Sequence, residues 1–420
     1  MGRKPIFIAL GLFLVVAVTA TVAILTGDET RDAEPRPLDP SVEPTWSTNV
    51  TAFNALAADA RDGLVLVPER EKGLSLRDGG SGEPRWLIEP EADLPGADGV
   101  KWLDAADTPQ LVSHDDGLAA LVAVQRCDPC SDEDPQSAST ELGVALLSGE
   151  DGHVLWRTPL VPGERMATDQ ARISTFLADD RIAVVGVTSE AETAETEVRT
   201  IAVAVDDGTV LWEVADVSPL AIAGDVVLTV GHPFTMSQTI GAGGLATGSV
   251  GAMAADTGEP LWNLRDQYDR SQLVLVAGDV ALVRVVGEGK RHPRGLVITL
   301  DRAQVLDELG YGDLDGCATD QRQIICPRDG DLWMFQVEDG AVRTVTPEID
   351  VTGVEAVTAD RIYVVGSRNH HSVDLGGRVV DEDLPGRFVA RGDDWAIFQT
   401  SAADAADSLE AFVDGYRLRQ

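Results

Sequence analysis

The sequence has little positive charge. Its 420 residues hold 33 Lys and Arg against 70 Asp and Glu, which gives a formal net charge of −37 at pH 7. Arginine supplies nearly all of the positive charge, and the only lysines are Lys4, Lys72, Lys101 and Lys290. A surface this acidic repels phosphate backbones and anionic headgroups over a Debye length of roughly 8 Å. The composition therefore argues against nucleic acid as a partner.

The chain also lacks the motifs of familiar hydrolases. It contains no nucleophile elbow followed by the acid and the histidine of a catalytic triad, and no H-E-x-x-H helix. Its 44% hydrophobic and 25% charged residues are nevertheless those of a globular protein, and the chain is long enough to bury a core. The sequence thus predicts a folded body for which no catalytic, cofactor-binding or metal-binding residues can be named.

An uncharged apolar segment lies near the N-terminus. Arg3 and Lys4 precede residues 5–26, which carry no charge, and acidic residues follow. As a helix this segment spans about 33 Å, close to the ~30 Å of a bilayer's hydrocarbon core. The positive-inside rule then predicts residues 1–26 as cytoplasmic tip and transmembrane anchor of a single-pass membrane protein. Cleavage near Ala20 as a signal peptide is the alternative, and either reading predicts an extracytoplasmic C-terminal body.

Residues 27–45 are rich in Asp, Glu and Pro and show no apolar periodicity. This composition predicts a stiff, solvated linker. The remaining residues, 46–420, are expected to form one body, because a repeated pattern runs through them.

The repeated pattern is an apolar strand, a turn that contains glycine, and a second strand that holds tryptophan. At residues 205–212 it reads Val-Asp-Asp-Gly-Thr-Val-Leu-Trp. Each copy places a glycine four residues before a tryptophan, and the four pairs are Gly82 and Trp86, Gly152 and Trp156, Gly208 and Trp212, and Gly258 and Trp262. A repeated supersecondary unit indicates a solenoid or a propeller, so these residues are predicted to be structural.

Short apolar runs accompany the hairpins. There are eight, at residues 64–67, 118–124, 182–187, 226–230, 280–286, 324–326, 362–365 and 395–398. They are bounded by Gly and Asp turns, and no long segment with a helical period separates them, which predicts an all-β chain. The fold class is therefore a β-propeller of four-stranded blades behind one transmembrane helix. Eight blades would average about 47 residues each, near the usual blade length, and seven is the fallback.

The last unit, residues 395–420, has no glycine-to-tryptophan hairpin of its own. Trp46, at the other end of the body, could supply the missing strand. An open array would leave sheet edges that invite aggregation. We therefore predict that the N-terminal strand near Trp46 completes the last blade and closes the ring.

These hairpins resemble the repeat of the pyrroloquinoline-quinone-like (PQQ-like) β-propeller family, which reads Ala-x-Asp-x-x-Thr-Gly-x-x-x-Trp. The best copy is Ala-Ala-Asp-Thr-Gly-Glu-Pro-Leu-Trp at residues 254–262. The match is good over residues 80–262 and weak beyond. There Ala303 and Asp307 replace glycine and tryptophan in the fifth unit, and Thr344 replaces tryptophan in the sixth, which keeps Gly340. The resemblance implies four-stranded blades around a channel, with each tryptophan docked between neighbouring blades.

The resemblance leaves the activity open. The family includes quinone-dependent dehydrogenases as well as propellers that only bind proteins, such as the lipoprotein of the outer-membrane assembly machine. The dehydrogenases carry two adjacent cysteines beside the quinone, and this chain has no Cys-Cys pair. We expect a non-catalytic binding or scaffold module for a protein or an envelope ligand. A quinone-dependent oxidoreductase and a calcium-dependent sensor or adhesion module are the alternatives, although no specific residues support PQQ or calcium.

The four cysteines form two local pairs, Cys127 with Cys130 and Cys317 with Cys326. In an exported protein disulfides are the expected state. A Cys-x-x-Cys sequence can also be a redox pair, but that chemistry normally uses a helix N-terminus, and here the sequence lies in a polar loop. Zinc binding by all four cysteines would require the two pairs to meet.

Four other stretches contain residue types found in binding sites. Residues 312–316 and 132–134 are rich in oxygen ligands but lack the spacing of a calcium loop. Residues 241–244 are rich in glycine without the strand-to-helix context of a phosphate loop, so a hairpin tip is expected. His370 and His371 are adjacent, and adjacent side chains on a strand point to opposite faces, so the pair is not expected to chelate one metal.

Overall fold

The fold is known from a computed structural model. It describes residues 43–51, 57–59, 62–69, 73–90, 92–103, 109–115, 117–127, 139–162, 171–190, 196–231, 248–286, 293–310, 314, 316–366, 369–392, 395–401 and 410–418. Antiparallel strands make up nearly all of the regular structure in these residues.

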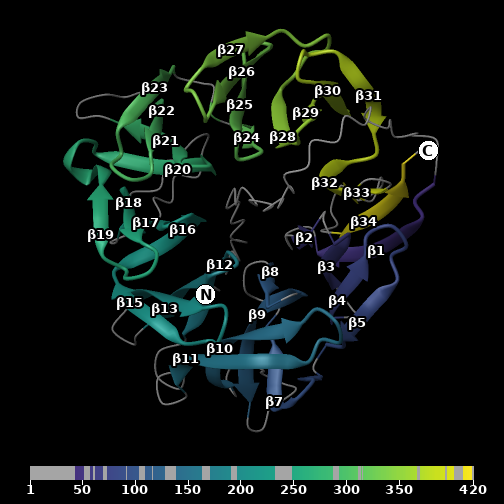
Figure 1. Ribbon diagram of the computed structural model, residues 1–420, viewed down its shortest axis with the longest axis vertical. Coiled ribbons are helices and arrows are strands. Elements are labelled where there is room, and N and C mark those ends of the chain that lie inside the picture. The colour runs from purple at the N-terminus through teal and green to yellow at the C-terminus, as the bar shows by residue number, and fades with distance from the viewer. Residues whose placement is uncertain are drawn as a thin grey trace, which may run out of the picture.

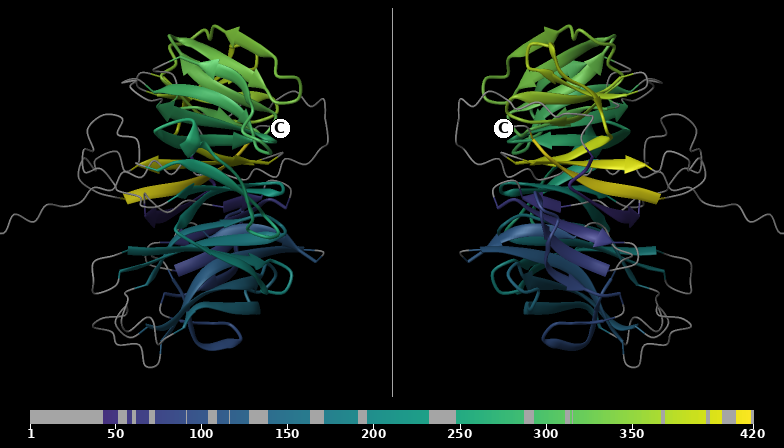
Figure 2. Two further views of the ribbon diagram at one scale, coloured as in Figure 1. Left: turned by 90° about the vertical axis from the view of Figure 1, so that its left-hand side faces the viewer. Right: turned by 90° about the vertical axis from the view of Figure 1, so that its right-hand side faces the viewer.

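The strands form eight blades arranged in a ring (Figure 1). Five blades are separate 4-stranded sheets, one is a 6-stranded sheet, and an 8-stranded sheet contains two blades. Side views show a disc in which the strands run between the two ring faces (Figure 2). The chain therefore forms an all-β propeller.

The first four blades follow one another along the chain. Blade 1 is β2 (Ala57–Asp59), β3 (Leu64–Glu69), β4 (Gly73–Asp78) and β5 (Pro84–Ile88); blade 2 is β6 (Asp93–Leu94), β7 (Ala97–Trp102), β8 (Gln110–His114), β9 (Gly117–Cys127), β10 (Ser139–Ser148) and β11 (Val154–Pro162); blade 3 is β12 (Arg172–Ala178), β13 (Ile182–Glu190), β14 (Thr196–Ala204) and β15 (Val210–Ala215); blade 4 is β16 (Val217–Ala223), β17 (Val226–Gly231), β18 (Val250–Ala254) and β19 (Pro260–Asn263).

The other four blades complete the ring. Blade 5 is β20 (Arg270–Ala277), β21 (Val280–Val286), β22 (Arg294–Thr299) and β23 (Val305–Leu309); blade 6 is β24 (Ala318–Thr319), β25 (Gln323–Arg328), β26 (Asp331–Gln336) and β27 (Val342–Val345); blade 7 is β28 (Gly353–Val357), β29 (Arg361–Val365), β30 (His370–Asp374) and β31 (Val379–Leu384); blade 8 is β32 (Arg387–Arg391), β33 (Trp395–Ser401), β34 (Glu410–Arg417) and β1 (Trp46–Thr51).

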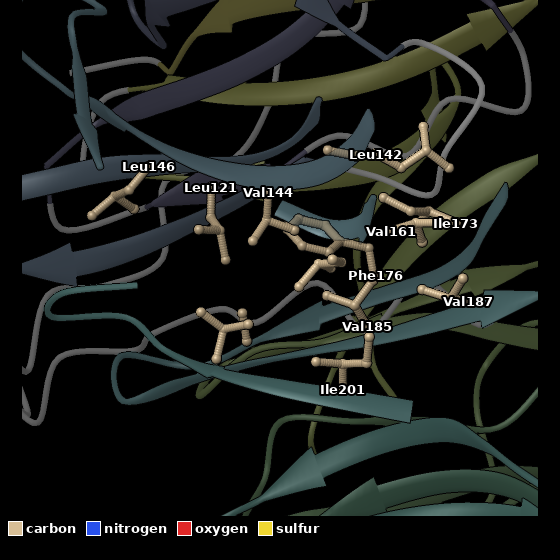
Figure 3. Close-up of a cluster of buried hydrophobic side chains, with 14 of the residues drawn as sticks. Leu121, Leu142, Val144, Leu146, Val161, Ile173, Phe176, Val185, Val187 and Ile201 are labelled. Carbon is tan, nitrogen blue, oxygen red and sulfur yellow. The ribbon is translucent and has the colours of Figure 1, made fainter. Parts of the chain in front are cut away.

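The core lies between the blades. The second and third strands of a blade are covered on both faces, so β3 is buried along its whole length and its first four residues, 64–67, are all apolar. One cluster of side chains joins blades 2 and 3 (Figure 3), and its members include Leu121, Val144, Leu146, Phe176, Val185 and Ile201. Each interface between blades thus buries the apolar faces that a single blade could not bury alone.

The first strand closes the ring. β1 pairs with β34 from Trp46 opposite Gly415 to Thr51 opposite Glu410, so it forms the outer strand of blade 8. It also contacts β3 of blade 1 through the pair Val50 and Glu69. The prediction that the strand at Trp46 completes the last blade is confirmed.

The predicted fold class needs one correction, because its transmembrane helix is not found. The helical element in the described part of the chain is the short 3-10 helix η1 (Leu264–Asp266), and no helix there is long and apolar enough to cross a membrane. Residues 1–26 and most of the predicted linker lie outside the described residues. The prediction rested on missing charge, which reports hydropathy and not helix formation. The fold class is corrected to an all-β propeller, and the single-pass membrane localisation is not supported.

Candidate functional site

The predicted repeat residues lie at the joints between blades. Gly208 has a φ of +74°, and a Cβ added to it would lie 2.7 Å from the Trp156 ring of the preceding blade. Its N–H donates to the carbonyl of Ala204 at 3.0 Å and closes the turn between β14 and β15. Glycine is therefore needed for the backbone conformation and for the close approach of the indole.

Four of the docked tryptophans also donate a hydrogen bond into the turn of the next blade, whereas the buried indole N–H of Trp86 has no partner among the described residues. The indole Nε1 lies 2.7 Å from the Val205 carbonyl for Trp156, 2.8 Å from Ala255 for Trp212, 2.6 Å from Leu300 for Trp262 and 2.9 Å from Gly79 for Trp46. Trp86 packs over Gly152 in the same way, while Gly82 receives Trp46 and Gly258 receives Trp212. These residues hold neighbouring blades together and bring no reactive groups into a common site.

One of the two cysteine pairs is formed. Cys317 and Cys326 are disulfide-bonded with their Cα atoms 4.2 Å apart, and both are buried where β24 and β25 begin blade 6. The predicted disulfide is confirmed for this pair. Cys127 ends β9, but Cys130 lies outside the described residues, so the second pair stays a prediction.

The other stretches weighed from the sequence do not form a site in the described residues. Residues 132–134 and 241–244 lie outside them, as does much of 312–316. His370 and His371 follow one another in β30, and Nδ1 of His370 lies 3.0 Å from Glu355 Oε1. The hydrogen bond to Glu355 raises the pKa of His370. No group of three potential metal ligands occurs among the described residues.

A depression of about 660 Å³ lies on one face of the ring, where blades 3, 4 and 5 meet. We call this face the turn face, because it carries the turns between strands 1 and 2 and between strands 3 and 4 of each blade. The walls are mostly apolar and include Leu211 of β15 and Leu261 of β19. Ala254 and Ala255, at the turn of blade 4, also line it.

A β-bulge explains why two leucines are exposed here. In blade 3, Val203 pairs with Val210 and Ala202 pairs with Trp212, so Leu211 has no partner across the strands. In blade 4, Met253 pairs with Pro260 and Ala252 pairs with Trp262, so Leu261 also has no partner across the strands. A bulge can re-aim a side chain, and Leu211 and Leu261 are 42% and 46% exposed, whereas Trp212 is buried and Trp262 is partly buried.

The depression is acidic. Three carboxylates, Asp225, Asp256 and Asp301, line it against one guanidinium, Arg181. Arg181 Nη1 lies 2.8 Å from Asp225 Oδ1, and this hydrogen bond raises the pKa of Arg181. The pair is exposed to solvent, so it contributes little to stability. The site therefore presents apolar walls with excess negative charge.

The electrostatics of Asp256 and Asp301 differ. The hydrogen bond from Arg302 lowers the pKa of Asp301, which stays ionised at neutral pH. Asp256 has no side-chain hydrogen bond or ion pair with another described residue. Its negative charge is thus available to an incoming cation.

The sequence pointed to the hairpins but not to this depression. A signal was present, because leucine precedes tryptophan in three of the four copies, at Leu155, Leu211 and Leu261. Whether that leucine is buried or exposed depends on the strand register, which a repeat pattern does not specify.

Comparison with known proteins adds little beyond the general fold. No protein-family model matches the chain, and no curated protein does. Among solved structures, BamB from Moraxella catarrhalis is similar with 14% identity and a TM-score of 0.44, over 88% of this chain and 99% of that one. Sqt1 from Saccharomyces cerevisiae is similar with 10% identity and a TM-score of 0.46, over 91% and 100%. A europium-containing methanol dehydrogenase is similar with 10% identity and a TM-score of 0.45, over 90% and 93%.

Proposed function

We propose that this propeller is a non-catalytic module that binds a partner protein at the depression between blades 3, 4 and 5. The observation that carries the proposal is the pair of bulge leucines, Leu211 and Leu261, held on the walls of an acidic depression. Apolar side chains beside Asp256, whose carboxylate is not paired with a cationic side chain of the described residues, suit a partner that offers apolar and cationic groups together.

The connection between the site and a blade joint supports this role. Leu211 precedes Trp212 in β15, and the Trp212 indole donates a hydrogen bond to the Ala255 carbonyl in the wall of the same depression. The interblade joint therefore sets the position of both the leucine and the alanine. A surface that is ordered before binding loses less conformational entropy when the partner arrives.

Site-specific photo-crosslinking in living cells tests the proposal. A photo-reactive amino acid is placed at Leu211 or Leu261 of the full chain, and at Val342 as a control. Val342 is also exposed, at 47%, but lies on β27 of blade 6, away from the depression. We expect the same adduct from both leucine positions, none from the control, and loss of the adduct at 211 when Leu261→Asp is added. No adduct at either leucine, or the same adduct from Val342, would contradict the proposal.

The non-catalytic part has its own test. The purified chain is mixed with pyrroloquinoline quinone, calcium and a panel of alcohols and sugars, and reduction of an artificial electron acceptor is followed. We expect no turnover above the protein-free control. Turnover that depends on the protein would favour the quinone-dependent oxidoreductase.

A further inference from the structure

Exposed apolar side chains are not scattered over the described surface. The eight large hydrophobic residues that are most exposed all lie on the outermost strands, and six of them belong to blades 2 to 5; the six are Leu155, Val210, Leu211, Leu261, Val305 and Leu306. Single exposed apolar residues are normal on a protein surface. Here the exposed side chains gather on the outer strands of four successive blades, and two of them, Leu211 and Leu261, line the same depression.

The same β-bulge places one leucine on the rim of each of these four blades. In blade 2, Leu147 pairs with Val154 and Leu146 with Trp156, which leaves Leu155 unpaired. In blade 5, the pairs Ile298–Val305 and Val297–Asp307 leave Leu306 unpaired. Leu155 and Leu306 are 46% and 44% exposed. Together with Leu211 and Leu261 they define what we call the leucine row.

The row ends where the residue type changes. In blade 1 the equivalent bulge holds Arg85, between the pairs Arg77–Pro84 and Leu76–Trp86. In blade 6, β26 and β27 pair without a bulge. The leucine row is thus confined to β11, β15, β19 and β23, which follow one another around the ring (Figure 1).

The arrangement restricts what can cover the row. One leucine per blade requires an occupant that runs along the rim across four blades, which a single side chain or a small ligand cannot do. A second copy of this chain carries the same net charge of −37, so long-range repulsion opposes self-association. Asp256, which lines the depression together with the two central leucines, favours cationic groups.

We infer that the partner contributes an elongated protein segment, rich in Lys or Arg, whose successive apolar residues contact Leu155, Leu211, Leu261 and Leu306 in order. The inference rests on the proposed function and extends it from a depression to a contact surface across four blades. The depression then receives the middle of the segment, where both apolar walls and carboxylates are available.

Photo-crosslinking at the ends of the row tests this inference separately. The photo-reactive amino acid is placed at 155, 211, 261 or 306 of the full chain, again with Val342 as the control, and the adducts are sequenced by mass spectrometry. We expect all four positions to react with one continuous segment of one protein, in the order of the row, with more Lys and Arg than Asp and Glu.

The outcomes distinguish the two proposals. Adducts from 211 and 261 without adducts from 155 and 306 would overturn the leucine row and leave the proposed function standing. Adducts from the four positions to different proteins, to a second copy of this chain or to an acidic segment would also overturn it. The absence of adducts at all four positions would contradict both proposals.

A binding measurement supplies a second readout. With the crosslinked segment as a labelled synthetic peptide, Leu155→Ser and Leu306→Ser are each expected to raise the Kd about fivefold, because each exposed leucine loses part of its apolar contact area. Val342→Ser should leave the Kd unchanged. Equal affinities for all of these proteins would contradict the row.

Discussion

The two parts of the ring are joined in different ways. Blades 8, 1, 2, 3 and 4 each dock a tryptophan onto the next blade, namely Trp46, Trp86, Trp156, Trp212 and Trp262. Blades 5, 6 and 7 carry Asp307, Thr344 and Asp381 on the outer strand instead. The same tryptophan contact therefore joins the blades of the first part, and it is absent from the described residues of the second part.

In the second part, individual contacts stabilise blades 6 and 7 and the joint between blades 7 and 8. Blade 6 has the disulfide between Cys317 and Cys326. In blade 7, Arg361 donates to Asp381 in a fully buried ion pair, and Ser372 Oγ donates to the same carboxylate at 2.5 Å. Tyr363 of blade 7 stacks on Phe388 of blade 8 with the ring centroids 3.7 Å apart. The comparison teaches that one ring can combine a repeated contact between some blades with unrelated contacts in and between the others.

Removal of one tryptophan should have the largest effect. Trp212→Ala is expected to lower the free energy of unfolding by about 3–5 kcal/mol, because it empties a buried joint and frees the Ala255 carbonyl. The matched change in the other part, Asp307→Ala, removes a partly exposed side chain and should cost less than about 1 kcal/mol. Denaturant titration of both proteins measures the difference. Equal losses of unfolding free energy in the two variants would mean that the docked tryptophan stabilises the ring no more than Asp307 does.

Loss of the buried ion pair between Arg361 and Asp381 should lower the free energy of unfolding by nearly as much. Asp381→Ala leaves the Arg361 guanidinium buried without its main partner, and a loss of about 3 kcal/mol is expected. The exposed pair between Arg294 and Glu308, 2.8 Å apart, is the control, and Glu308→Ala should cost less than about 1 kcal/mol. If both variants unfold at the same denaturant concentration, burial of the pair is not what stabilises blade 7.

The disulfide should contribute somewhat less. It closes a short loop, for which the chain-entropy model gives about 2.7 kcal/mol. Cys317→Ser combined with Cys326→Ser is therefore expected to lower the unfolding free energy by roughly that amount. Thermal unfolding with and without a reductant checks this, since the reductant should have less effect on the double variant. If the reductant lowered the melting temperature of the wild type and of the double variant equally, the Cys317–Cys326 disulfide would not be the bond through which the reductant acts.

The smallest expected effect is a dependence on pH at the point of ring closure. Glu69 accepts hydrogen bonds from Thr48 Oγ1 of β1 at 2.7 Å and from Ser75 Oγ at 2.6 Å, and it forms an ion pair with Arg77. Burial acts to raise the pKa of Glu69, but the hydrogen bonds from Ser75, Thr48 and Arg77 outweigh it and hold the pKa below its usual range.

The sign follows from this lowered pKa. The contribution of Glu69 to stability is present above the unfolded pKa of about 4.5 and is lost as the pH falls through the lower folded value. Glu69→Gln is therefore expected to lose stability at pH 7 and to show a flatter decline in acid than the wild type. Melting curves between neutral and acidic pH test this prediction. Parallel pH profiles would show that Glu69 does not couple β1 to blade 1.

The sequence was informative where the structure is repetitive. The glycine and tryptophan of each hairpin are local signals that the spacing reveals, whereas the docking of tryptophan between neighbouring blades was implied by the family resemblance. Trp46 could be assigned to the last blade because that blade has no glycine-to-tryptophan hairpin of its own. The Arg361–Asp381 pair could not be expected, because it depends on a contact between strands that are far apart in the pattern. The leucine row was also missed, since the exposure of each leucine follows from the β-bulge, which the repeat pattern does not specify, and Leu306 is not followed by tryptophan.

The central claim is that a partner binds the tryptophan-jointed part of the ring at Leu211 and Leu261. The most direct test is the affinity of the crosslinked partner for three purified proteins: the wild type, the Leu211→Ser/Leu261→Ser double variant, and Val342→Ser. We predict that the double variant weakens binding by at least about tenfold, since two apolar contacts are lost, while Val342→Ser binds like the wild type. Equal affinity for all three proteins would contradict the claim.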